Sequence, residues 1–146
     1  MKNFFKYAML LIVVIMSGVV VSSCGEDDGE SGSQGSIYGT WKANVGDDGE
    51  NAVCTIKITK NSMDIKWVED NGDYEEEVYD TFNYDESECK ITAHRCKEIF
   101  HSKGETEEYA EDKVKTYYVT WLDSKHIQIG KEPGEAISDF GTLKKQ

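Results

Sequence analysis

Two neighbouring stretches of the chain carry an apolar side chain at every second position. In residues 52–58 and 63–67 the apolar positions alternate mainly with polar ones, and they are Ala52, Cys54, Ile56, Ile58, Met63, Ile65 and Trp67. Because successive side chains of a β-strand point to opposite faces, a period of two predicts two half-buried strands. Residues 37–146 contain no comparable stretch with a helical period, so we predict an all-β domain.

The connections on either side of residues 63–67 predict how the strands pair. A tight turn at Lys60-Asn61 would set the apolar positions of the first strand opposite those of the second. Asn71-Gly72 is typical of a two-residue type I′ hairpin turn, because both residues tolerate a positive φ. This second turn would pair Trp67 with Glu76.

Further strand-like segments extend along the rest of the chain. They lie at residues 39–45, 81–84, 89–100, 114–122, 126–130 and 137–144. About eight short strands in consecutive order need closure or a second sheet to protect their edges. We therefore predict an antiparallel up-and-down barrel of about eight strands.

The first 24 residues have the pattern of a secretory leader. A basic tip precedes the apolar residues 7–21, which number about 15 and fall short of the ~20 that a membrane-crossing helix needs. The ending Val21-Ser22-Ser23-Cys24 resembles the lipobox of bacterial lipoproteins. The resemblance implies that the Cys24 thiol is lipidated and that residues 1–23 are removed. An ordinary signal peptide with an incidental cysteine is the alternative.

Residues 24–36 have the composition of a tether. An acidic cluster follows Cys24 and resembles the surface-export signal of Bacteroidetes-type lipoproteins. The glycines and serines up to residue 36 form a flexible linker that cannot bury a core. The resemblance implies a lipid-anchored protein of the outer membrane that faces the cell exterior, and a merely solvated acidic tether is the alternative.

Residues 37–146 resemble a small lipocalin-like domain at both ends. Gly39-Thr40-Trp41 resembles the Gly-x-Trp signature of lipocalins, in which the tryptophan closes the barrel floor. The ending 140–145 is similar to the last strand of lipocalin-like lipoprotein domains, in which a basic residue lies over that tryptophan. The resemblance implies a structural role for Gly39 and Trp41, whereas Trp41 in the core of another β-sandwich is the alternative. We do not expect this chain to bind the ligands of classical lipocalins, because the Thr-Asp-Tyr-type motif and the C-terminal helix are not found in its sequence.

The charge of the chain restricts its partners. Removal of residues 1–23 takes away two lysines and no acids, so 14 basic against 28 acidic residues leave a net charge of −14. This charge excludes nucleic acid as a partner and opposes contact with a like-charged membrane, so we expect the membrane to be reached only through the lipid on Cys24. Residues 37–146, about 110 in number, suit one small domain, which we expect to be monomeric.

The sequence holds no recognisable catalytic or cofactor motif, so we predict neither enzymatic activity nor a cofactor. His94 and His101 would lie about 23 Å apart along one strand, and we predict no metal site. The same distance separates Cys89 from Cys96, and Cys54 is expected at the other end of the barrel. We therefore predict no disulfide among these three cysteines, although a bulge could rescue one pair.

The predicted register has a consequence for the inner face of the barrel. It would place Glu76 and Asp80 inward beside Trp67, although an apolar core should not hold two carboxylates. We therefore predict a wet or ligand-holding mouth, with a wall formed by Trp67, Tyr74, Glu76 and Asp80. The alternatives are a bulge that turns the carboxylates outward and an ion pair with an inward basic residue such as Arg95.

Together these features predict a membrane-anchored, non-enzymatic binding module for an unknown small molecule. The alternative is a structural or protein-interaction component of a cell-envelope complex. An exposed aromatic patch would favour that alternative, with candidates Tyr79, Tyr109, Tyr117 and Tyr118.

Overall fold

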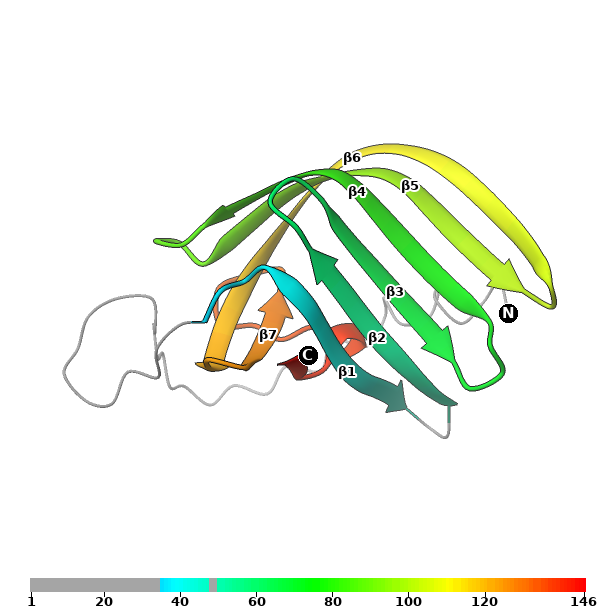
Figure 1. Cartoon of the computed structure of the whole chain (residues 1–146), viewed down its shortest axis with the longest axis horizontal. Helices are drawn as coiled ribbons and strands as arrows, with labels where there is room; N and C mark the ends of the chain where they lie inside the picture. Colours follow the sequence, from blue (N-terminus) through cyan, green and yellow to red (C-terminus); the bar gives the residue numbers. More distant parts are fainter. Residues whose placement is uncertain (1–34, 48–49) are drawn as a thin grey trace.

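The computed structural model describes residues 35–47 and 50–146, so the predicted leader, Cys24 and most of the tether lie outside the described residues. The described chain forms eight strands and one short 3-10 turn: β1 (Gly39–Asp47), β2 (Glu50–Ile58), β3 (Met63–Glu69), β4 (Tyr74–Asp85), β5 (Lys90–Ser102), β6 (Glu105–Asp123), β7 (His126–Gly130), η1 (Ser138–Phe140) and β8 (Leu143–Lys145). Each strand pairs antiparallel with the next, and β8 pairs with β1, which closes the barrel (Figure 1). The prediction of an all-β, up-and-down barrel is confirmed.

The strands of the barrel differ greatly in length. β4, β5 and β6 have 12, 13 and 19 residues, and in Figure 1 they arch over the other strands as one broad sheet. β7 and β8 have only 5 and 3 residues, and they connect β6 to β1. The barrel is therefore closed by short strands along one part of its wall, while the hairpin of β5 and β6 extends beyond them.

The register between β2 and β3 is the predicted one. Cys54, Ile56 and Ile58 lie opposite Trp67, Ile65 and Met63. Across the two-residue turn, the Thr59 N–H donates to the Ser62 carbonyl at 2.9 Å. Apart from the half-buried Trp67, these facing apolar side chains are buried in the core.

The predicted register between β3 and β4 is wrong by one residue. Trp67 pairs with Glu75, and Lys66 pairs with Glu76. The connection is a three-residue loop, in which the Glu69 N–H donates to the Asp73 carbonyl at 2.9 Å and Gly72 has a φ of +88°. A glycine in this left-handed region is typical of a three-residue hairpin loop. Because side chains alternate between faces, the shift of one residue exchanges the inner and outer faces of this part of β4.

A bulge interrupts the pairing of β4 with β5. Tyr79 pairs with Arg95 and Thr81 pairs with His94, so Asp80 has no partner in this ladder. The extra residue lets Tyr79 and Phe82 both lie in the core, although they are three positions apart. Asp80 follows the inward Tyr79 and is exposed, so it faces outward beside the bulge.

Trp41 of β1 is part of the hydrophobic core. Its ring is fully buried, and its Nε1–H donates to the Ile37 carbonyl at 2.8 Å. The Nζ atom of Lys145 lies 5.4 Å from the ring centroid. Gly39 has a φ of +127° and lies against Lys145, where an added Cβ would come within 3.3 Å of its side chain. The predicted last strand is shorter than expected, because residues 138–140 form η1 and the strand begins at Leu143.

Candidate functional site

The structure does not bring the four predicted wall residues together. Trp67 points inward, where its Nε1–H donates to the Asp139 carbonyl at 2.8 Å. Tyr74 and Glu76 contact Lys66 instead, with the Lys66 Nζ atom 3.6 Å from the Tyr74 ring centroid and 3.2 Å from Glu76 Oε2. Glu76 thus faces outward, in a hollow of about 320 Å³ lined also by Lys42, Thr55 and Lys57. The prediction of an inward Glu76 is wrong because of the three-residue loop.

Asp80 also lies away from the inner face. Its carboxylate is 2.7 Å from Nδ1 of His94, whose Nε2 is 2.8 Å from Asp112. The hydrogen bonds to Asp80 and then to Asp112 raise the pKa of His94. These three residues connect β4, β5 and β6 on the outer surface, so the prediction of Asp80 as an inner wall residue is wrong.

Two neighbours of Glu76 supply the inward carboxylates. Glu75 and Glu77 lie on β4 and Glu98 lies on β5, with carboxylate oxygens within 4.8 Å of one another. Three clustered carboxylates repel one another and are stable only with compensating charge or bound protons. This cluster is the starting point of the candidate site.

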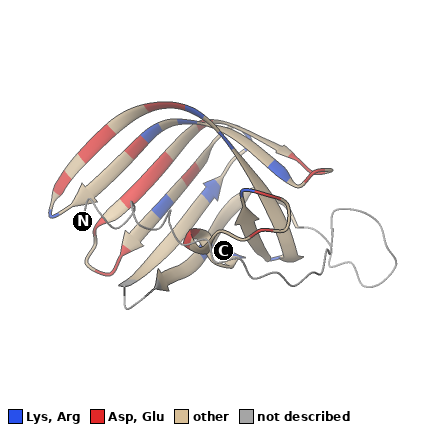
Figure 2. Cartoon of the chain, turned by 180° about the vertical axis from the view of Figure 1, so that it is seen from behind, with Lys and Arg blue, Asp and Glu red and all other residues tan. Residues whose placement is uncertain are grey.

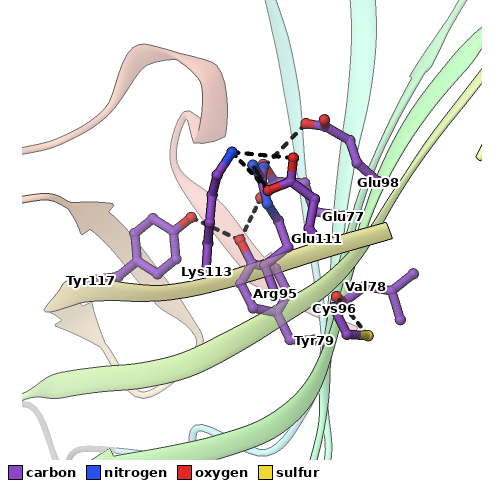
Figure 3. A network of polar contacts seen from close by, with 9 residues as sticks. All are labelled: Glu77, Val78, Tyr79, Arg95, Cys96, Glu98, Glu111, Lys113 and Tyr117. Atoms are coloured by element: carbon purple, nitrogen blue, oxygen red, sulfur yellow. Dashed lines mark hydrogen bonds and ion pairs between the residues drawn. The ribbon is translucent and has the colours of Figure 1, made fainter. Parts of the chain in front are cut away.

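Arg95 supplies most of the compensating charge. Its side chain is 7% exposed, and its Nη1 donates to Glu77 and, at 3.1 Å, to Glu98. Its Nη2 donates to Glu111 of β6 at 3.2 Å, and Glu111 also pairs with Lys113 at 2.8 Å (Figure 3). Arg95 therefore ties three strands together through charge-assisted hydrogen bonds. The sequence left open an ion pair of Arg95 with Glu76 or Asp80. Arg95 does form ion pairs, but its partners are Glu77, Glu98 and Glu111.

Two buried phenols complete the network in Figure 3. The Tyr79 hydroxyl donates to Glu77 at 2.5 Å and lies 2.9 Å from the hydroxyl of Tyr117. Burial raises the pKa of Tyr117 to about 12 and that of Tyr79 further still. Both phenols therefore stay protonated; Tyr79 donates to Glu77, and the Tyr117 hydroxyl can donate to the Tyr79 oxygen.

Two polar atoms of this cluster are buried without a hydrogen-bond partner among the described residues. They are Oε2 of Glu75, an acceptor, and Nε of Arg95, a donor. Burial, followed by the charges of Glu98 and Glu77, raises the pKa of Glu75 to about 7. The cluster therefore holds a carboxyl group that titrates near neutral pH and has unused hydrogen-bonding capacity.

Aromatic rings adjoin the polar cluster. Trp67, which pairs with Glu75 across the two strands, stacks on Phe140 of η1 with ring centroids 5.7 Å apart. Tyr117 meets Phe140 edge-on at 5.8 Å. The polar cluster therefore lies beside a group of packed aromatic rings, and small-molecule sites commonly combine a few polar groups with aromatic side chains.

The three clustered carboxylates have the ligand type that hard cations prefer. Two of them already accept hydrogen bonds from Arg95, and a cation would compete with its guanidinium. The geometry therefore suits a hydrogen-bonding guest better than a bare metal ion.

The cysteines do not pair with one another within the described chain. Cys54 and Cys96 are free thiols, so neither of them forms a bridge with Cys89. Burial raises the pKa of the Cys54 thiol to about 12. The prediction of no bridge among the three is confirmed.

The sequence could have identified part of this site. In the run Glu75-Glu76-Glu77 at least one carboxylate faces inward in either register. The sequence therefore predicts an acidic inner wall, but it does not show which of these glutamates form it. Glu98 and Glu111 gave no such signal, because only the pairing of β5 with β4 and β6 brings them to Arg95.

Comparisons with protein-family models, with curated proteins and with solved structures found no match to this chain. Among the described residues, none forms a helix of the length and apolar character needed to cross a membrane.

Proposed function

We propose that this protein is a lipid-anchored, non-enzymatic binding module that holds a small molecule at the polar cluster inside its barrel. The unpartnered Glu75 Oε2 and Arg95 Nε carry the proposal. A buried polar atom without a partner costs about 1–3 kcal/mol, and a bound guest would recover that cost.

The chemistry of the cluster indicates the kind of guest. It would donate a hydrogen bond to Glu75, accept one from Arg95 and place a flat apolar part against Trp67 and Phe140. A small polar molecule with an aromatic or other planar group meets these requirements.

The leader and tether support the location that we propose. Residues 1–23 and Cys24 have the lipoprotein pattern, and the acidic tether is similar to a surface-export signal. We propose the outer membrane, with the barrel facing the cell exterior. The net charge of −14 after cleavage favours a domain that stands away from an anionic membrane.

A protein-interaction role in the cell envelope is the second candidate. The four tyrosines do not form one exposed patch, because Tyr79 and Tyr117 are buried. Exposed apolar side chains do lie on β6, where Val114 is 69% and Tyr109 is 46% exposed. These positions favour a contact along that strand.

Native mass spectrometry tests the proposed binding. The full-length protein, purified from its own membranes in mild detergent, should carry one small-molecule adduct per chain. Glu75→Gln should lose the adduct, because the ionised acceptor is removed, and Glu76→Gln should keep it, because Glu76 faces outward. A bare wild-type mass, or an equal adduct in both variants, would contradict the proposal.

A further inference from the structure

β6 has a long edge without a neighbouring strand among the described residues. β7 pairs with β6 only between Tyr118 and Asp123. Residues Glu105–Tyr117 have β5 on one side, paired at Glu105–Ala110 and Lys113–Tyr117, with a bulge at residues 111–112 between them. The six residues before the bulge alone span about 20 Å. The segment Glu105–Tyr117, here named the free edge, is long enough to accept a complete additional strand.

The turn before β6 indicates which backbone groups the free edge presents. Lys103 and Gly104 have φ values of +54° and +81°, as a two-residue type I′ turn requires, and Ser102 pairs with Glu105. The closing pair of such a hairpin is hydrogen-bonded, and hydrogen-bonded positions then alternate along the strand. Thr106, Glu108 and Ala110 therefore direct their N–H and C=O groups away from β5.

The side chains of the free edge have one dominant charge. Five acidic residues precede the first base, Lys113; they are Glu105, Glu107, Glu108, Glu111 and Asp112. Glu108, Glu111 and Asp112 already pair with side chains of β5, so Glu105 and Glu107 are the acids without an ion pair there. Figure 2 shows these acidic bands along the long outer strand. Charged side chains at an exposed edge oppose pairing with like-charged strands.

This charge discriminates between possible occupants. A second copy would bring another mature chain of net charge −14 to the edge, and the chain's own tether between residues 26 and 30 is acidic as well. A basic strand is the complementary occupant, because opposite charges on facing strands stabilise a sheet. Tyr109 and Val114 would add apolar contacts beside it.

We propose that the free edge of β6 docks an extended, basic segment of another protein by strand addition. Main-chain hydrogen bonds to residues such as Thr106 and Ala110 would hold the added strand, and Lys or Arg at alternate positions would pair with the acidic side chains. This inference does not depend on the small-molecule site, because that site lies on the inner face.

A pair of synthetic peptides separates strand addition from simple charge attraction. The first is a ten-residue Lys-Val repeat with blocked ends, and the second has the same sequence with an N-methyl group on every backbone nitrogen, so that neither edge can donate. The full-length protein in mild detergent should bind the first at least about tenfold more tightly, because methylation removes donors but no charge. Hydrogen exchange should slow in residues 105–117 on binding.

Two variants test the location of the peptide. Ala110→Pro removes an N–H from the free side of the edge without touching the ladder to β5, and it should abolish binding. The combined change Glu105→Gln, Glu107→Gln and Glu108→Gln leaves the backbone intact and should weaken binding about tenfold at low salt. If Ala110→Pro does not fold, the peptide affinity of the triple variant tests the location of the peptide.

Equal affinity for the two peptides, or slowed exchange elsewhere than in residues 105–117, would overturn the proposal. Dimerisation of the protein through the free edge, seen by sedimentation and lost in Ala110→Pro, would overturn it as well, because a second copy would then be the occupant.

Discussion

Replacement of Glu75 by glutamine should stabilise the protein at neutral and alkaline pH. Burial and the neighbouring carboxylates raise the pKa of Glu75 from 4.5 to about 7. That difference corresponds to about 3 kcal/mol against the ionised form, and solvent screening of a half-buried side chain reduces it to about 1.5 kcal/mol. Glutamine avoids this cost, and its amide can donate to Glu77 or Glu98.

The sign of the pH dependence follows from the direction of the pKa change. Below pH 4.5 the carboxyl group is protonated in the folded and unfolded states, and it costs nothing. Between pH 4.5 and 7 the unfolded state loses the proton first, so the wild type loses stability relative to Glu75→Gln as the pH rises. The advantage of the variant should be about 1.5 kcal/mol larger at pH 8 than at pH 4.

Urea unfolding at both pH values measures this difference, and Glu76→Gln is the matched control. Glu76 forms an outer ion pair with Lys66, so its replacement should cost at most about 1 kcal/mol at pH 8. A Glu75→Gln variant that gains no stability between pH 4 and pH 8, or a Glu76→Gln variant that gains it instead, would refute the observed register.

Three further predictions concern other parts of the chain. Arg95→Met should lower the free energy of unfolding at pH 8 by about 3–5 kcal/mol, because Glu77, Glu98 and Glu111 would lose their shared cation, and a loss below 1 kcal/mol in urea unfolding would contradict this. Gly72→Val should cost about 1–2 kcal/mol, since a β-branched residue resists a φ of +88°, and an unchanged unfolding midpoint would mean that the loop does not need this conformation. Cys24→Ala should leave the protein without acyl chains and outside the membrane fraction; a wild-type mass without acyl chains, or unchanged partitioning of the variant, would argue against lipidation.

The sequence predicts the fold where both faces of a hairpin agree in chemistry. Between β2 and β3, apolar positions meet on one face, and Lys57 meets Asp64 on the other. Only one register satisfies both faces. The prediction of that hairpin was therefore correct to the residue.

The predicted register between β3 and β4 is wrong because the sequence there is chemically degenerate. Lys66 meets a carboxylate whether it pairs with Glu76 or with Glu77, so the outer face does not distinguish the two registers. Asn71-Gly72 also fits either loop length, since Gly72 can end a three-residue loop. The choice is made by tertiary contacts, in which Tyr79 and Phe82 reach the core across a bulge.

The start of β6 had no local signal at all. Residues 105–112 contain five acids and no alternation of apolar residues. They become a strand because β5 supplies a hydrogen-bonded partner and side chains such as Lys97, which pairs with Glu108 at 2.9 Å. The strand conformation of residues 105–112 depends on their pairing with β5, so the sequence of these residues alone does not predict it.

The position of the Glu75 carboxyl group inside the barrel is the basis of both the register of β4 and the proposed binding site. A pH titration followed by carbon NMR on glutamate-labelled protein, with Glu75→Gln used to assign the signal, measures its pKa. We predict a midpoint near 7, as burial beside Glu98 and Glu77 requires. A midpoint near 4.5 would place the carboxyl group in water and would contradict both the inward register and the binding site built on it.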